Sequence, residues 1–228
     1  MESATRIRRL GIVNVFIVDE DDGLTVVDTA IRGSHKSILR HAALASKPIE
    51  RILLTHAHDD HVGALDALAA AVPDAQVVAT SRDARLMAGD LSLDEDEPQT
   101  KLRGGLSGTE TVPTRLVGDG EHVGSLRVIA TPGHTPGHIA LLDERDGTLY
   151  CGDVFSTLGG MATTAQVNPL FPLPAMATWH RPTVIESAKK LVELAPERLA
   201  PGHGRVVERP VPDMRTMIAK AEKKLAGK

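Results

Sequence analysis

The chain has 228 residues, of which 42% are hydrophobic and 25% charged, an ordinary composition for a globular protein. Its net charge of −4 argues against a broad basic surface for nucleic acid, and an aromatic content of 2% leaves few rings to stack on bases. With Cys151 as the single cysteine, neither an intrachain disulfide nor a thiolate zinc cage can form.

The first predicted elements are a pair of strands. The stretch "VNVFIVDEDDGLTVVDT" predicts strands at about residues 14–18 and 24–28, around an acidic turn that ends at Gly23. The basic N-terminus before it runs into an apolar stretch that is too short to span a membrane, and no small-residue cleavage site follows. We therefore expect neither a signal peptide nor a membrane-spanning segment, and a cytoplasmic location.

Helices and strands alternate in the next part of the chain. Ser34 begins a predicted helix at residues 34–46, and "IERILLT" predicts a buried strand. A helix in "GALDALAAAV", a strand in "AQVVAT" and a short helix in "SRDARLMAG" follow. Residues 89–111 are polar and glycine-rich without a clear period, which predicts a long loop or lid whose acidic run at 94–97 is solvated.

Short strands return after this loop. Residues 115–150 contain several of them, with turn signals at Asp119-Gly120 and Asp146-Gly147. The remaining predicted elements are a helix at 183–195, a strand in "ERLAPGHG" and a helix at 213–226. This order predicts two similar halves that pack through their sheets with helices outside, in a single domain over residues 1–228.

The stretch "THAHDDH" places three histidines and two aspartates directly after a predicted strand. Alternate residues of an extended chain share a face, so His56, His58 and Asp60 converge, and a turn before Gly63 brings His61 to them. A polar helix N-terminus capped by an aspartate is the simpler alternative. Histidines that alternate with carboxylates favour a metal site instead, because imidazole and carboxylate are ligands of zinc.

Three further residues project from strand ends into turns. They are His134 in "TPGHTPGH", Asp153 in "CGD" and His203 in "PGHG". Open α/β folds place their sites where strands end, so these side chains are candidate ligands. Any one of them alone is a weak signal, whereas four such positions in one chain are a strong one.

These motifs, in this order over residues 14–205, resemble the metallo-β-lactamase superfamily. The resemblance implies an α/β (α+β) fold, a four-layer αββα sandwich with a binuclear metal site in the groove between the sheets. It implies that one metal is held by His56, His58 and His134, that the other is held by Asp60, His61 and His203, and that Asp153 bridges both. Two Zn²⁺ are the expected cofactors, and iron or manganese suits the same donors.

The expected chemistry follows from such a pair of metals. A hydroxide shared by two metals is a nucleophile at neutral pH, and the same ions polarise a carbonyl or phosphoryl oxygen. The resemblance implies that Asp60 hydrogen-bonds this hydroxide and carries a proton to the leaving group, which makes it the candidate catalytic residue. Cys151 is expected in the core. His138 is expected to have a supporting role rather than to bind metal.

The segment after Asp153 bears on the substrate. It contains no lysine or arginine before Arg181 and several large apolar residues, of which Phe171 and Trp179 are predicted to contact substrate. Some of these apolar side chains could instead pack between the sheets. An apolar wall beside the metals favours a lactone, ester or thioester of modest polarity. Ser156 stands where acyl-homoserine lactone hydrolases of this superfamily typically carry a tyrosine, which weakens that narrower assignment.

We therefore predict a cytoplasmic metallo-hydrolase that uses a metal-bound hydroxide on an ester-like bond of a small molecule. No nucleic acid or membrane partner is expected, and a homodimer is left open. One alternative is a β-lactamase-like or phosphodiester hydrolase on the same site. Another is a mononuclear iron oxidoreductase of the persulfide dioxygenase type, which binds one iron through two histidines and one aspartate. A third is a non-catalytic binding protein, against which the complete ligand set argues.

Overall fold

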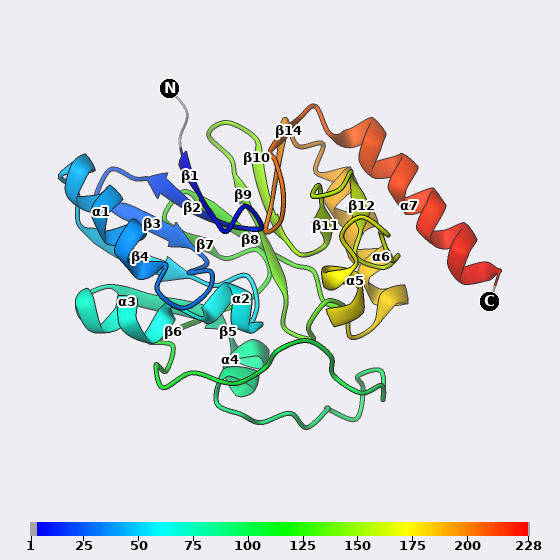
Figure 1. The fold of residues 1–228 in the computed structure, drawn as a ribbon, viewed down its shortest axis with the longest axis horizontal. Helices are drawn as coiled ribbons and strands as arrows, with labels where there is room; N and C mark the ends of the chain where they lie inside the picture. Colours follow the sequence, from blue (N-terminus) through cyan, green and yellow to red (C-terminus); the bar gives the residue numbers. More distant parts are fainter. Residues whose placement is uncertain (1–3, 228) are drawn as a thin grey trace.

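A computed structural model describes residues 4–227, in which the strands form two six-stranded sheets and one small pair (Figure 1). The first sheet contains, in spatial order, β1 (Ala4–Arg9), β2 (Val13–Asp19), β3 (Leu24–Val27), β4 (Ile49–Leu53), β5 (Gln76–Thr80) and β6 (Arg115–Val117). The second contains β14 (Val207–Glu208), β13 (Arg198–Pro201), β10 (Thr148–Gly152), β9 (Ile139–Asp143), β8 (Leu126–Ala130) and β7 (His122–Val123). The small pair is β11 (Phe155–Ser156) with β12 (Ala162–Thr163).

Helices lie on the outer sides of the two sheets (Figure 1). They are α1 (His35–Ala45), α2 (Asp59–Val62), α3 (Leu65–Ala71), α4 (Ser81–Met87), α6 (Arg181–Glu193) and α7 (Val211–Ala226). The short helix α5 (Leu173–Ala177) contributes no residue to the clusters under these helices. Within residues 4–227, no helix combines the length and the apolar character that crossing a membrane requires.

Three apolar clusters hold the layers together. Phe16, Leu53 and Tyr150 belong to the cluster between the two sheets. Ile52 and Leu54, the neighbours of Leu53, point the other way and join the cluster that packs against α1, α3 and α4. A third cluster joins the second sheet to α6 and α7. Because both faces of each sheet are covered, the strands read as nearly continuous apolar runs, and the fold is the predicted αββα sandwich.

Parallel pairing brings the ends of distant strands together. β3 pairs with β4 in parallel, and β10 pairs with β13 in the same way. Their carboxyl ends therefore lie at one edge of each sheet. Ile139 N donates to Thr55 O (2.9 Å), which joins the two sheets at this edge. The residues just after these strand ends are consequently close in space, although they lie far apart in the sequence.

One strand was not predicted, and one of the two predicted turns does not connect a hairpin. The N-terminal residues form β1, which pairs antiparallel with β2 along its whole length and was not predicted. Asp146-Gly147 joins β9 to β10 as an antiparallel hairpin, as expected. Asp119-Gly120 is not a hairpin, because β6 belongs to the first sheet and β7 to the second. This turn is instead the crossing between the two halves of the chain.

The long connection from α4 to β6 contains no helix or strand, as predicted (Figure 1). Its acidic run is not solvated throughout, however. Arg82 donates to both carboxylate oxygens of Glu97 (2.7 and 2.9 Å), and Arg85 donates to Asp94 (2.7 Å). The prediction was wrong for Glu97, whose side chain is 16% exposed, because it could not see that Arg82 on α4 faces this carboxylate. Asp94 pairs with Arg85 but stays 47% exposed.

Candidate metal centre

The histidine cluster follows strand β4. The chain stays extended as far as His58, whose φ is −68° and ψ 145°, and α2 begins at the next residue. His56 and His58 are thus two residues apart on an extended stretch, and one helical turn returns His61 toward them. His61 N donates to His58 O (2.8 Å), which closes this turn.

The folded chain brings all seven predicted ligands together. Their ligand atoms form three overlapping groups, and within each group all atoms lie within 4.8 Å of one another. The groups are His56 with His58 and His134, His56 with His61 and Asp153, and Asp60 with His61 and His203. Asp153 Oδ2 lies 3.4 Å from His134 Nε2 and 3.2 Å from His203 Nε2. This carboxylate therefore stands between the two predicted ligand sets.

Each histidine of the cluster is oriented by a contact to its outer ring nitrogen. The pairs are His56 Nδ1 with Thr55 Oγ1 (3.0 Å), His58 Nε2 with Arg103 O (2.9 Å), His61 Nδ1 with Asp28 Oδ2 (2.8 Å), His134 Nδ1 with Thr178 Oγ1 (3.0 Å) and His203 Nδ1 with Ile12 O (3.1 Å). An outer nitrogen that donates to such a partner carries the proton. In the neutral ring the inner nitrogen, Nδ1 in His58 and Nε2 in the others, then presents a lone pair to the centre.

The inner atoms of the cluster fit a cation. His58 Nδ1 and His134 Nε2 lie 3.0 Å apart, and with these tautomers two lone pairs face each other. His56 Nε2, His61 Nε2 and Asp153 Oδ1 are buried and have no hydrogen-bond partner within residues 4–227. Buried polar atoms are rarely left in this state. A metal ion satisfies imidazole nitrogen and carboxylate oxygen together.

The charges of the cluster support the same interpretation. Burial opposes a charge on His61 and on His203, but nearby carboxylates outweigh it and raise the pKa of His61 to about 9 and that of His203 to about 10. Burial also opposes the charged forms of Asp60 and Asp153, yet the histidines hold the pKa of both carboxyls well below the usual range. The carboxylates thus favour positive charge at the centre, which protons or a metal can supply.

Asp28 belongs to the site but was not predicted from the sequence. Its carboxylate is 3% exposed and accepts hydrogen bonds from Thr55 N, Thr55 Oγ1 and His61 Nδ1, each at 2.8 Å. A carboxylate behind a ligating histidine fixes the tautomer of the ring and raises its basicity. The available signal was an aspartate directly after the apolar run "LTVV", the same strand-end position that marked the other candidates.

Two residues near Asp153 match their expected places. His138 accepts a hydrogen bond from Asp153 N through Nε2 (3.0 Å), while its Nδ1 contacts Thr131 Oγ1 (2.9 Å). Both ring nitrogens are therefore engaged, and His138 supports the backbone that carries Asp153. Cys151 is fully buried in the cluster between the second sheet and its helices, and burial raises the pKa of its thiol.

Asp83 is a second buried carboxylate that sequence reasoning missed. It lies on α4 and accepts hydrogen bonds from Ala57 N, Gly137 N and Thr135 Oγ1, all at 2.8 Å. Burial raises its pKa to about 6, which these hydrogen bonds only partly offset. Asp83 thus ties the extended stretch of the first histidines to the turn that carries His134.

A cavity of about 330 Å³ opens over the cluster. Five candidate ligands line one side of it, namely His58, Asp60, His134, Asp153 and His203, and its apolar side contains Ile12, Phe171, Leu173, Pro174, Met176 and Ala177. The ring of Phe171 lies 5.4 Å from that of His203, so this predicted substrate contact is in the wall. Trp179 does not line the cavity. It is 5% exposed, and its Nε1 donates to Thr100 O (2.9 Å).

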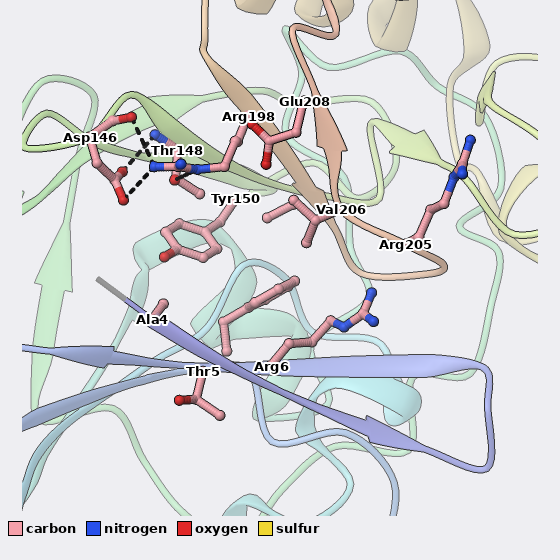
Figure 2. Close-up of a pocket in the computed structure, with 12 residues that line it drawn as sticks. Ala4, Thr5, Arg6, Asp146, Thr148, Tyr150, Arg198, Arg205, Val206 and Glu208 are labelled. Atoms are coloured by element: carbon pink, nitrogen blue, oxygen red, sulfur yellow. Dashed lines mark hydrogen bonds and ion pairs between the residues drawn. The ribbon is translucent and has the colours of Figure 1, made fainter. Parts of the chain in front are cut away.

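A larger cavity of about 490 Å³ lies between β1 and the β13–β14 edge of the second sheet (Figure 2). Its lining includes the rings of Phe16 and Tyr150 and the side chains of Arg198 and Arg205. Figure 2 shows Arg198 turned toward Asp146, with which it forms an ion pair (2.7 Å). None of the seven candidate ligands lines this cavity, so we place the functional site at the smaller one.

The sequence profile of the metallo-beta-lactamase superfamily matches residues 8–203, which include every candidate ligand. The chain belongs to the metallo-β-lactamase superfamily. Its similarity to the uncharacterized protein YobT of Bacillus subtilis is 47% identity over 212 residues, covering 92% of this chain and 91% of that protein. The probable metallo-hydrolase YflN of the same organism is 29% identical over 214 residues, covering 85% and 81%.

Other similar proteins either match this chain over only part of their length or match its fold over most of the chain at lower identity. A hydroxyacylglutathione hydrolase of Aeromonas hydrophila is 29% identical over 149 residues, which cover 64% of this chain and only 47% of that protein. The crystal structure of TTHA1623 in a di-iron-bound form is 25% identical, with a TM-score of 0.66 over 92% of this chain and 96% of that one. The B3 metallo-β-lactamase BLEG-1 is 21% identical with a TM-score of 0.68, over 91% and 95%, which shows a shared fold.

Family membership and the geometry of the cluster together define the class of the protein. The chain is a metallo-hydrolase of the metallo-β-lactamase superfamily, with a histidine–aspartate cluster that is able to bind metal.

Proposed function

We propose that this metallo-hydrolase binds two metal ions and cleaves an ester-like bond of a small, uncharged substrate, namely a lactone, ester or thioester. One observation carries the proposal. A single cavity has the candidate ligands on one side and an apolar wall on the other. At about 330 Å³ it suits a small molecule, because ligand pockets begin near ~300 Å³.

The ligand arrangement supports two metals rather than one. The two predicted sets share no residue, and Asp153 lies within 3.4 Å of a histidine from each. Two metals held by these ligand sets would supply an activated water, with a pKa lowered to about 7, and would polarise the carbonyl of a substrate. Zinc suits the donors, and iron does so as well, as the di-iron form of TTHA1623 illustrates for that protein.

Asp60 is the residue best placed to move a proton. Its side chain is 42% exposed, whereas those of His203 and Asp153 are 3% exposed, and it lines the cavity. Its Oδ2 lies 3.3 Å from His203 Nε2, and the nearby histidines keep its carboxyl ionised. An ionised carboxylate that faces the substrate accepts a proton from the attacking water and returns it to the leaving group.

The apolar wall supports the choice of substrate. Ile12, Leu173 and Met176 line the cavity and are still 37%, 59% and 58% exposed, so they offer apolar surface that a substrate can cover. No lysine or arginine side chain lines this cavity among residues 4–227. A phosphodiester or the two carboxylates of glutathione need such cations, so a neutral lactone or ester fits better than either.

The test combines a metal count with a substrate screen. The purified chain is loaded with Zn²⁺ or Fe²⁺, its metals are counted, and lactones, esters, thioesters, β-lactams and phosphodiesters are offered. We expect two metals per chain, hydrolysis of a neutral lactone, ester or thioester, and a loss of kcat of about 10²–10⁴-fold in Asp60→Asn. His203→Ala should lose one metal. Glu144→Gln, in an exposed turn, is the matched control.

Three results would each contradict a part of the proposal. The first is a single iron per chain together with oxygen uptake, which is the behaviour of a mononuclear oxidoreductase. The second is equal hydrolysis by Asp60→Asn and by the parent, which would remove Asp60 from the reaction. A preference for β-lactams or phosphodiesters would keep the metal site and refute the substrate class.

A further inference from the structure

The stretch "TKLRGGLS", residues 100–107, lies within the long connection between α4 and β6, and we call it the strap. This connection runs along the lower side of the molecule in Figure 1. Gly104 and Gly105 of the strap line the cavity over the candidate ligands. Leu102 and Leu106, on either side of the two glycines, pack against the apolar cluster of the first half. The strap is therefore anchored in the core and also covers the site.

Asp59 holds the strap by three hydrogen bonds. Its carboxylate accepts from Ser107 N and from Ser107 Oγ, both at 2.8 Å, and its own backbone N donates to Gly105 O (3.0 Å). Asp59 lies between the candidate ligands His58 and Asp60 in the sequence, and its carboxylate belongs to none of the three ligand groups. The residue thus links the ligand-bearing turn to the strap.

The two glycines allow the strap to lie directly on this turn. A Cβ at Gly104 would be 2.4 Å from His58 Nε2, and the φ of Gly104 is +87°. A Cβ at Gly105 would be 2.5 Å from Asp59 Oδ2. At the start of the strap, Thr100 O accepts the hydrogen bond from the Trp179 indole. Backbone atoms of the strap therefore contact the turn where any side chain would collide.

The strap provides the hydrogen-bond partner of the outer ring nitrogen of His58. Arg103 O accepts from His58 Nε2 (2.9 Å), which leaves Nδ1 to face His134. The other cluster histidines are oriented by residues on or next to strands and helices, whereas Arg103 lies in a connection without regular structure. A loosened strap would withdraw this carbonyl, and the ring of His58 could then rotate or change its tautomer.

We propose that Asp59 is a positioning residue for metal binding: by clamping the strap, it keeps the Arg103 carbonyl on His58 and directs His58 Nδ1 to the metal. The proposal rests on the proposed function in that it assumes a metal at this set of ligands. Asp59 itself touches neither metal nor substrate. Its effect reaches the site through Gly105, Ser107 and the carbonyl of Arg103.

Three variants test the clamp. Asp59→Ala removes both side-chain hydrogen bonds to Ser107. Asp59→Asn keeps both, because its amide oxygen accepts from Ser107 N and its amide nitrogen donates to Ser107 Oγ, so it should rescue the parent behaviour. Asp66→Ala is the matched control, because Asp66 accepts from Thr111 N (2.7 Å) and Glu110 N (3.2 Å) in the same connection but beyond the strap.

Two readouts report on the strap without enzyme activity. Lys101 and Arg103 are exposed, so trypsin cleavage after either is identified by the mass of the N-terminal fragment. Trp179 is the single tryptophan of the chain, and its fluorescence reports on the contact to Thr100. In Asp59→Ala we expect faster cleavage and an emission that shifts to longer wavelength. Asp59→Asn and Asp66→Ala should resemble the parent in both.

The third readout is the dissociation constant of the metal, measured by competition with a chelator. Loss of a group that orients a ligand weakens binding by about 10–100-fold, and we expect this for Asp59→Ala alone. A loosened strap with unchanged metal affinity would refute the coupling, and an unchanged strap would refute the clamp. If the parent binds no metal, the proposed function fails, and the ¹⁵N shifts of His58 in the parent and in Asp59→Ala then decide the proposal through its tautomer.

Discussion

Replacing Asp28 by asparagine tests whether the cluster depends on a carboxylate behind His61. The change keeps the shape of a side chain that is 3% exposed. The φ of Asp28 is +59°, a backbone conformation that asparagine also adopts readily, so no new strain is introduced. What changes is one acceptor oxygen and the negative charge.

The expected loss of metal affinity or of stability follows from the three hydrogen bonds that the Asp28 carboxylate accepts. If the new amide nitrogen faces His61 Nδ1, the ring must accept there and carry its proton on Nε2, which then cannot bind metal. If it faces Thr55 N instead, a buried donor is left unpaired, which destabilises the fold by about 1–3 kcal/mol. We expect metal binding weaker by about 10–100-fold, or about 1.4–2.8 kcal/mol.

Chelator competition measures the metal affinity, and urea unfolding of the metal-free protein measures the stability. Asp143→Asn is the control, because Asp143 is a fully buried carboxylate paired with Arg145 at the opposite end of β9 from His138. The control should lower stability and leave metal affinity unchanged. Metal binding by Asp28→Asn as tight as that of the parent would show that His61 does not need this carboxylate.

Further predictions concern proton release on metal binding, the pH dependence of stability, the close packing of Gly202 against Asp153, and the buried carboxylate of Asp83 on α4. The pKa of His61 is about 9 and that of His203 about 10, so both rings are protonated near neutral pH without metal. Metal binding should therefore release about two protons, which calorimetry in buffers of different ionisation enthalpy measures. Binding without proton release would refute the positive charge of these two rings. Both folded pKa values lie above the unfolded value of about 6.5, so their stabilisation is complete below that pH and is lost as pH rises through 9–10. The melting temperature of the metal-free protein should therefore fall over this window more than that of the metal-bound protein. Gly202→Ala should lose metal, because its Cβ would lie 2.5 Å from Asp153 Oδ1. Gly118→Ala is the control and should bind metal as the parent does, because the atom nearest to its Cβ would be 3.7 Å away. Equal metal content in both variants would contradict this packing. Asp83→Asn should lower the free energy of unfolding by about 1–3 kcal/mol, because its amide leaves Ala57 N or Gly137 N without an acceptor; an unchanged urea midpoint would count against the contact.

The sequence by itself determined which residues form the candidate centre. Each of the seven candidate ligands stands in a short local pattern, an apolar run followed by a turn, and such patterns are legible without the fold. His56 and His58 were predicted to lie on one side of the chain, because alternate residues of an extended stretch share a face. The sandwich was predictable from the order of strands and helices, which indicated two halves packed through their sheets, and from the family resemblance of the motifs.

Only the tertiary structure decided how these side chains are oriented and what surrounds them. Arg103 O orients His58 across 45 residues of sequence, and Ile12 O orients His203 across 191. The tertiary structure also places Phe171 in the wall of the cavity and Trp179 outside it, where its indole binds the strap. Local patterns state where a chain extends or turns. The partner of a ring nitrogen depends on which distant backbone packs against it, and that follows from the sheet pairing rather than from neighbouring residues.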